Sequence, residues 1–316
     1  MSKFLQEVPV DCNKDVREAI KRTGLAWNVS LQPLFTASRQ QMLDGGLSED
    51  IVDKFNHSYS ATVNKFATVR MDNGTVLGVV GKNYTPLQNI SSFDFFQPFL
   101  DSGCCTLETS GCLYGGVKTV LTAKINRPDL DMGDGDVIQK RIMLFNSNDG
   151  SSAVRAGFIA RRLRCFNQMP MINRSKDSSL IRFRHSANLA LNLSLVRDII
   201  NTADATFEAT LAQFKRLQNW AINRADIEKY VKIVLDIKDT DEISTRTKNK
   251  IEELVGYCIN SPGADGKSLY SVLNGITYYT SNKYGRNEES RFDALNFGAS
   301  LTLNERALKV LSDIAE

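Results

Sequence analysis

The residues in this sequence that are best suited to chemistry are the arginines that follow position 153. Four of them lie between Ala153 and Phe166 in an otherwise largely apolar run, and basic residues continue as far as His185. Between Ala153 and His185 the only acidic residue is Asp177. Because an unpaired charge is costly to bury, this density of arginine predicts a face that meets solvent or a ligand.

The chemistry predicted for this basic segment is the binding of single-stranded nucleic acid. Guanidinium groups bind phosphate through paired hydrogen bonds, and aromatic rings stack on bases. The arginines are interleaved with Phe158, Phe166 and Phe183. The expected phosphate contacts are Arg155, Arg161, Arg162, Arg164, Arg182, Arg184 and His185, with Lys82, Tyr84 and Lys118 as weaker candidates from neighbouring segments.

Two considerations limit this interpretation. In an unbulged strand Arg161 and Arg162 point to opposite faces, so only one of them can serve a given surface. The arginines could also be structural, paired with acids elsewhere in the chain such as Glu108 or Asp198.

Other chemistries have weaker support in the sequence. The segment 261–268, SPGADGKS, resembles a phosphate-binding loop, but Ser261 stands where the first glycine is needed, so we expect a loop that leads into a helix capped by Ser268. His57 and His185 are the only histidines and lack the spacing of metal ligands. We therefore expect no metal and no cofactor, and we interpret the acidic segment 131–136 as a solvated turn.

The basic segment belongs to a predicted β-hairpin. Its strands are 142–145 and 153–166, and its turn, 146–152, contains Asp149 and Gly150, a pair that suits a tight turn with positive φ at the glycine. Alternating patterns predict further strands at 63–71, 76–80, 104–109, 111–114 and 117–125. Helical periodicity predicts helices at 90–100, 188–220, 226–237, 243–259, 269–280 and 303–314.

These elements divide the chain into three parts. Residues 1–60 form an N-terminal segment of uncertain role, 61–187 a β-rich core with a basic face, and 188–316 a helical region that packs on the sheet. The predicted fold class is α+β: a curved antiparallel sheet with an inserted helix, backed by the long amphipathic helix 188–220 and a C-terminal helical region.

The composition is that of a globular protein. The 316 residues are 42% hydrophobic and carry a net charge of only +3, so the basic segment stands out against a nearly neutral chain. Six cysteines without paired CxxC motifs indicate reduced thiols, and the sequence lacks a cleavable leader and a window of transmembrane length. The expected location is the cytoplasm of a host cell.

Five segments resemble one known family. They are NYTPLQN at 83–89, NSNDGSSAVRAGF at 146–158, RCFNQM at 164–169, RHSAN at 184–188 and GKSLYSVLNGITYYT at 266–280. The chain resembles, from about residue 64 to its C-terminus, a domain-of-unknown-function family that is widespread on phage and plasmid genomes. The sheet and long helix of that family are similar, at the level of fold, to single-strand annealing recombination proteins.

The resemblance and the basic segment together favour one function. We expect the protein to bind single-stranded DNA and to promote strand annealing in phage or plasmid recombination, as a homo-oligomeric ring or filament and without covalent chemistry. One alternative is a metal-dependent nuclease or nucleotide-processing enzyme that uses a carboxylate such as Asp149. Another is a protein-binding module that counters a host factor.

Overall fold

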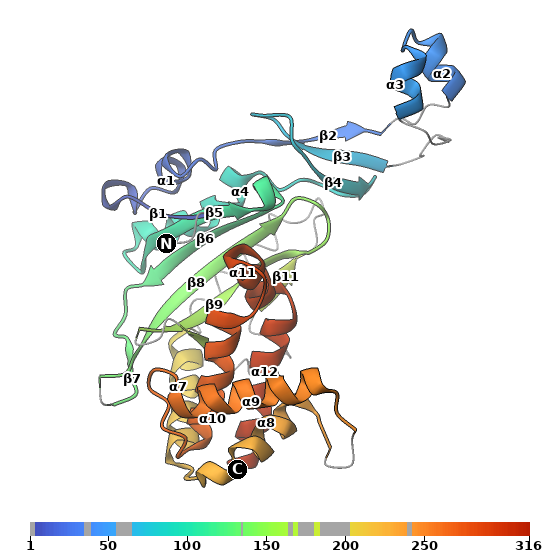
Figure 1. Cartoon of the computed structure of the whole chain (residues 1–316). Coiled ribbons are helices and arrows are strands. Elements are labelled where there is room, and N and C mark those ends of the chain that lie inside the picture. The colour runs from blue at the N-terminus through green and yellow to red at the C-terminus, as the bar shows by residue number, and fades with distance from the viewer. Residues whose placement is uncertain are drawn as a thin grey trace.

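The structure is a computed structural model of the 316-residue chain. It describes residues 4–34, 39–54, 65–133, 135–163, 167–169, 180–183, 203–238 and 242–316. Within these ranges the chain forms a large and a small antiparallel β-sheet, followed by a C-terminal group of helices (Figure 1). The α+β class predicted from the sequence is therefore confirmed.

The large sheet carries the predicted basic hairpin at its centre. Its main strands pair in the order β1–β5–β6–β8–β9, and β10 and β11 both pair with β9, while β7 pairs with β8. The strands are β1 Leu5–Glu7, β5 Cys105–Leu113, β6 Lys118–Ile125, β7 Leu130–Asp131, β8 Val137–Ser147, β9 Val154–Arg162, β10 Gln168–Met169 and β11 Leu180–Phe183. The small sheet is β2 Val29–Pro33, β3 Lys65–Arg70 and β4 Val76–Gly81.

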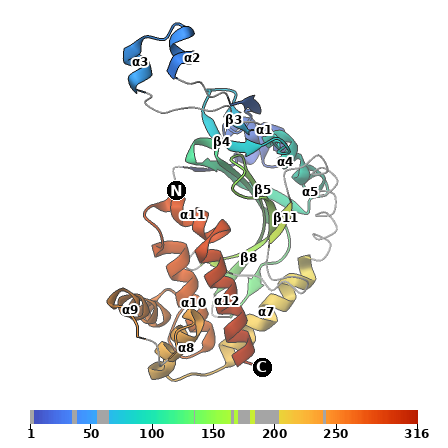
Figure 2. The same ribbon diagram turned by 90° about the vertical axis from the view of Figure 1, so that its right-hand side faces the viewer.

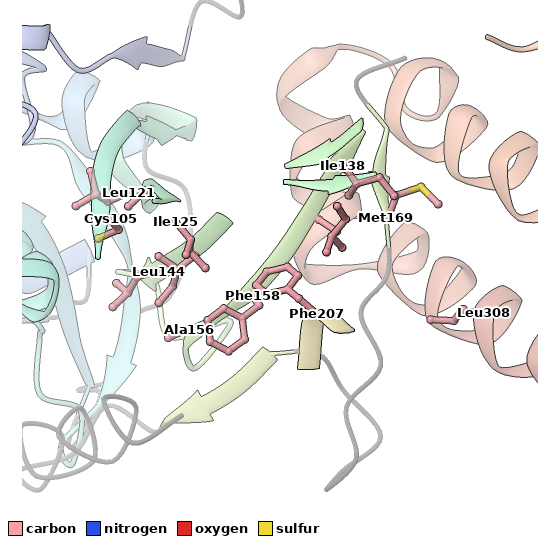
Figure 3. Packing of buried hydrophobic residues seen from close by; sticks show 14 of the residues in the cluster. Cys105, Leu121, Ile125, Ile138, Leu144, Ala156, Phe158, Met169, Phe207 and Leu308 are labelled. Carbon is pink, nitrogen blue, oxygen red and sulfur yellow. The ribbon is translucent and has the colours of Figure 1, made fainter. Parts of the chain in front are cut away.

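The large sheet is curved, and its convex face holds most of the core (Figure 2). Leu121, Leu144 and Phe158 lie on this face, where Phe207 contacts Phe158 with ring centroids 5.5 Å apart (Figure 3). The helices that contribute residues to this cluster include α1 Val16–Arg22, α4 Asn89–Phe93, α5 Gln97–Asp101 and α7 Ala203–Asn219. Because side chains alternate along each strand, the same strands also present a second face, which is concave.

The concave face has a smaller apolar cluster. Val120, Met143, Phe145 and Ile159 pack there against α11, Glu288–Phe297, and the sheet bends around this helix (Figure 2). The rings of Phe145 and Phe297 lie 4.6 Å apart in an edge-to-face arrangement. One sheet thus contributes to two separate apolar clusters, one on each side.

The C-terminal helices begin at side chains that satisfy their first backbone N–H groups. Ser244, Ser268 and Asn287 each accept a hydrogen bond from the backbone of the third residue that follows. The capping role predicted for Ser268 is confirmed. The helices are α8 Ile227–Leu235, α9 Thr245–Asn260, α10 Leu269–Tyr278, α11 and α12 Ala299–Ile314, with a π-helical turn at Tyr279–Lys283 after α10. The N-terminal half also contains α2 Arg39–Asp44 and α3 Glu49–Lys54.

The helices differ from the prediction in two regions, 90–100 and α11. The segment 90–100 is not one helix but α4, a 3-10 turn at Asp94–Phe96 and α5, and Pro98 stands in the first turn of α5, where a missing N–H costs nothing. Helix α11 was not predicted. The predicted helix 188–220 corresponds to α7 from Ala203 onward, and its first part lies outside the described residues.

The predicted turn at Asp149 and Gly150 is confirmed, and it also joins the two sheets. Gly150 has φ +74°, and Asp149 Oδ1 accepts hydrogen bonds from Ser151 N at 3.0 Å and Ser147 Oγ at 2.6 Å. The turn packs on β4 so closely that a Cβ at Gly78 would lie 2.5 Å from the Cα of Asp149. The small sheet therefore docks on the end of the β8–β9 hairpin.

Candidate nucleic-acid interface

The basic side chains of the hairpin divide between the two faces of the large sheet. Strands β8 and β9 pair symmetrically about Gly150, with Phe145 opposite Arg155 and Gln139 opposite Arg161. Odd-numbered residues of both strands face the concave side, where Phe145 and Ile159 pack, and even-numbered residues face the convex side. The separation of Arg161 from Arg162 that alternation predicts is confirmed.

At one end of the concave face, helix α11 covers the candidates Lys118 and Arg155. Lys118 Nζ forms an ion pair with Asp293 and lies 4.6 Å from the ring centroid of Phe297. Arg155 is 9% exposed, donates from Nη1 to the backbone oxygen of Asn296 at 3.1 Å and stacks at 4.9 Å over Phe297. Both cations hold α11 on the sheet, and we leave them out of the proposed interface.

Further along the same face, Arg141 and Arg161 form an arginine pair, the name used below for these two residues. Arg141 stands opposite Ile159, and Gln139 stands opposite Arg161, so the two arginines are diagonal neighbours across β8 and β9. Arg141 is only 5% exposed. Its Nη2 donates to the carboxylate of Glu108 and, at 2.8 Å, to Oε1 of Gln139.

Arg141 has more donors than its neighbours accept. Its Nε and Nη1 are buried and have no hydrogen-bond acceptor among the residues that the structure describes. A buried N–H without an acceptor costs free energy, and in native proteins such a group needs an explanation, for which strain, a catalytic role or a bound water or ion are examples. Arg141 therefore keeps two donors that the described residues do not use.

The two guanidinium groups of the arginine pair repel each other. The pKa of Arg161 is lowered, first by burial and then by the charge of Arg141, and the carboxylate of Glu108 offsets this only in part. Burial and the charge of Arg141 therefore both disfavour a positive charge on Arg161.

Arg162 lies on the convex side and has a structural role. It is 1% exposed, and its Nε and Nη2 contact the two carboxylate oxygens of Asp136, each at 2.5 Å. Its Nη1 donates to Oδ1 of Asn274, and the backbone oxygens of Pro262 and Gly263 accept at 3.4 and 3.3 Å. The prediction that Arg162 contacts phosphate conflicts with this burial, because its donors are already used within the protein.

The same contacts explain the segment that resembles a phosphate-binding loop. Residues 261–268 present backbone oxygens to Arg162, and a Cβ at Gly263 would lie 2.2 Å from its Nη2. Gly263 adopts φ +73°, a conformation that suits glycine. The loop therefore surrounds a cation, in agreement with the expectation that it is not a nucleotide site.

The two candidates from the small sheet lie apart from the arginine pair. Tyr84 donates from its hydroxyl to the backbone oxygen of Ser147 at 2.8 Å, and burial together with the charge of Asp149 raises its pKa above the usual range. Lys82 is exposed in the loop after β4. Tyr84 thus helps to dock the small sheet, and Lys82 is available to solvent.

The remaining candidates cannot be placed in full. Arg164, Arg184 and His185 lie outside the described residues. Arg182 is described for its backbone, which pairs with Arg155 at the edge formed by β11.

The sequence analysis missed Arg141, although a signal for it was present. A hairpin centred on Gly150 places residues equally distant from the glycine opposite one another, and this register brings Arg141 next to Arg161. The basic composition of 153–185 drew attention to the second strand only. A cross-strand reading of the first strand would have found the pair.

Asp131 and Asp136, the described carboxylates of the acidic segment 131–136, have different partners. Asp136 is held by Arg162, Asp131 Oδ1 accepts from the backbone N–H of Gly133 at 2.8 Å, and Asp134 is not described. In the described part of the chain, no group of three or more His, Cys, Asp or Glu side chains could hold a metal ion. Among the described helices, none has both the length and the apolar character needed to cross a membrane.

Comparison with known proteins gives a family and no function. No curated protein matches the chain, and no solved structure matches it either. Residues 76–296, more than half of the 316 residues, match one family, and this match includes the hairpin and the arginine pair. The chain therefore belongs to the family described as "Domain of unknown function (DUF932)".

Proposed function

We propose that the protein binds single-stranded DNA on the concave face of the large sheet and promotes the annealing of complementary strands. The observation that carries this proposal is the arginine pair, two guanidinium groups on adjacent strands that face the carboxylate of Glu108. The proposed role is phosphate binding and requires no covalent chemistry. The site residues are Arg141 and Arg161, with Lys124 on the neighbouring strand β6.

The donors of the arginine pair suit a backbone phosphate. A phosphodiester offers two anionic oxygens, and a guanidinium group donates to such oxygens through paired hydrogen bonds. Nε and Nη1 of Arg141 are two buried donors without an acceptor among the described residues, while Nη2 contacts Glu108. Lys124 stands opposite Arg141 in the β6–β8 register, and its Nζ lies 3.8 Å from Oδ2 of Asp129, which partly compensates this third positive charge.

Annealing in particular, and a role in phage or plasmid recombination, are supported by resemblance. The motifs of this chain resemble those of a family that we associate with phage and plasmid genomes, and the annealing role rests on the resemblance of that family to single-strand annealing proteins, since no solved structure matches the chain. Fold similarity does not establish function, so annealing needs its own experiment.

The binding proposal can be tested by a salt titration of binding to labelled single-stranded DNA, double-stranded DNA and single-stranded RNA. Arg161→Ala and Arg141→Met should each weaken binding to single-stranded DNA about tenfold, the value of one charged hydrogen-bonding contact. Each should also reduce the salt slope by about 0.7, the single-strand value for one phosphate. Lys309→Ala, at an exposed position of α12, removes the same charge and should change neither quantity.

Two further measurements complete the test. Annealing of complementary oligonucleotides, followed by energy transfer between end labels, should accelerate with the protein and should slow in Arg161→Ala. Incubation with magnesium should leave the DNA intact. Loss of intact DNA, or variants of the arginine pair that bind like the wild type, would contradict the proposal.

A further inference from the structure

Four tyrosines gather on the surface of the C-terminal helices. The ring of Tyr257 on α9 lies 5.2 Å from that of Tyr278 on α10 and 6.4 Å from that of Tyr279, and Tyr284 lies 5.9 Å from Tyr279. All four side chains are partly exposed. We call these residues the tyrosine cluster. Aromatic side chains that are grouped at a surface and open to solvent are a common feature of binding sites.

Cations stand beside these rings. Lys250 Nζ lies 5.9 Å from the ring centroid of Tyr279, and Arg246 precedes Lys250 by one helical turn on α9. Glu253 follows on the same face and accepts a hydrogen bond from the hydroxyl of Tyr257 at 3.0 Å. The cluster therefore combines four rings with two cations and one carboxylate.

The electrostatics of the cluster favour an anionic partner. Burial and the charge of Arg246 lower the pKa of Lys250, so its ammonium lacks full compensation. Burial and the hydrogen bond to Glu253 raise the pKa of Tyr257 to about 12, so the hydroxyl stays neutral at ordinary pH. Neutral rings beside a cation can accept both parts of a nucleotide, the base and the phosphate.

The tyrosine cluster is connected to the strand that carries Arg161. The π-helical turn Tyr279–Lys283 contacts β10, because Ser281 Oγ accepts from the backbone N–H of Gln168 at 3.1 Å and Asn282 donates to Asn167 at 3.0 Å. Gln168 stands opposite Arg161 in the sheet. The π-turn thus links the cluster to the arginine pair through one short strand. Single π-helical turns occur frequently at functional sites.

We infer that the tyrosine cluster is a second contact surface for the same single strand, where Tyr257, Tyr278 and Tyr279 stack on bases and Lys250 meets the backbone. This inference rests on the proposed function, since it extends the strand from the arginine pair across β10 to the helices. Stacking on aromatic rings is tolerant of sequence because every base has a π face. The cluster therefore provides affinity without sequence preference.

The chemistry distinguishes this partner from other anions. Inorganic phosphate or a polyanion without bases would use Lys250 and Arg246 and gain nothing from the rings. A base contributes stacking energy that depends on the aromatic ring and not on the tyrosine hydroxyl. The decisive comparison is therefore between ordinary and abasic oligonucleotides of equal charge.

The test uses the full chain with Tyr278→Leu and Tyr278→Phe. Tyr278 is partly exposed and contacts the ring of Tyr257. For an oligothymidylate of about 30 nucleotides, longer than the site sizes of about 4–16 nucleotides per single-strand module, Tyr278→Leu should weaken binding about fivefold to a hundredfold. Tyr278→Phe should bind within about twofold of the wild type, because it keeps the ring.

Abasic oligonucleotides and crosslinking separate stacking from a structural effect. The wild type should bind the abasic strand more weakly than the oligothymidylate, and Tyr278→Leu should reduce this difference while leaving abasic binding unchanged. Photocrosslinking of the wild type with an oligonucleotide that contains 5-iodouracil should label peptides of the tyrosine cluster. Crosslinking uses the wild type, so it tests the inference even if Tyr278→Leu fails to fold.

Each contrary result has a distinct meaning. If Tyr278→Leu weakens binding equally to the oligothymidylate and to the abasic oligonucleotide, or if crosslinks form only in other peptides, the tyrosine inference is overturned. The proposed role of the arginine pair is not affected by either result. A loss in Tyr278→Leu without any loss in Arg161→Ala would keep the tyrosine surface and overturn the proposed site on the sheet. Absence of single-strand binding by the wild type would overturn both.

Discussion

The substitution Arg162→Met separates the structural arginine of the hairpin from the proposed binding arginine next to it. Arg162 is almost completely buried on the convex side and contacts Asp136 through two of its nitrogens. Methionine preserves much of the apolar stem of arginine but removes every donor. The carboxylate of Asp136, itself 8% exposed, would then be buried without its partner.

The expected loss of stability is large. Removing one member of a buried ion pair costs about 3–5 kcal/mol, because the remaining charge keeps its desolvation penalty. The backbone oxygens of Pro262 and Gly263 and the amide of Asn274 also lose a donor. Since a domain is stable by only about 5–15 kcal/mol, this single change removes a considerable part of the total.

Equilibrium unfolding in urea, followed by circular dichroism, measures the loss. The double variant Arg162→Met with Asp136→Asn neutralises the stranded carboxylate and should recover about 1–3 kcal/mol, the coupling energy of residues in direct contact. Binding of single-stranded DNA by the folded fraction of Arg162→Met should match the wild type. A loss of stability below about 1 kcal/mol, together with weaker DNA binding, would refute the structural role and restore Arg162 to the interface.

Three further predictions concern the turn and the assembly. Gly150 and Gly74 both have φ +74°, but a Cβ would lie 3.0 Å from Val80 Cγ1 at Gly150 and in open space at Gly74. Gly74→Ala should therefore cost about 1–2 kcal/mol of unfolding free energy from backbone strain, and Gly150→Ala at least about 1 kcal/mol more; equal costs would show that the turn is not docked on β4. Burial would raise the pKa of Asp149, but hydrogen bonds from Ser147 and Ser151 outweigh this and lower it. Its stabilising contribution should be complete above its ordinary pKa of about 4 and lost as the pH falls through the lower folded value, so Asp149→Asn should flatten the dependence of the urea midpoint between about pH 5 and pH 3. In light scattering with a long single strand, the protein should form an assembly larger than a dimer, and a strict monomer at all concentrations would count against annealing.

Much of the fold could be predicted because the local signals agreed with the tertiary structure. In the β8–β9 hairpin the apolar strands and the Asp149–Gly150 turn indicate the same conformation, and both are confirmed. In α7 the apolar residues Phe207, Phe214 and Leu217 recur at helical spacing and are fully buried. Where the hydrophobic pattern and the turn residues indicate the same conformation, tertiary packing agrees with the local preferences of the chain.

Helix α11 could not be predicted, for a physical reason. Its apolar residues Phe292, Leu295 and Phe297 do not form one stripe, because the helix contacts the concave face on one side and other helices on another. Its start is marked only by a local capping box between Asn287 and Ser290. A short helix of this kind is stabilised mainly by its tertiary contacts, which composition and period do not reveal.

The candidate site was predicted less well than the fold, because the sequence shows where arginines are concentrated and not what they face. Asp136 precedes the basic segment and is distant from Arg162 in the sequence. The register of the hairpin brings the two residues together, and Asn274 of α10 contacts Arg162. The composition of a segment does not distinguish an arginine that is buried from an arginine that binds a ligand. The alternation of side chains along the strand separates the two cases. Even-numbered residues, such as Phe158, point to the main core, where an arginine needs an internal acid. Odd-numbered residues, such as Ile159, point to the concave face. By this criterion Arg161 and Arg141 share one surface and Arg162 belongs to the other, so a binding experiment on Arg161 and a stability experiment on Arg162 test the same statement about the sheet from its two sides.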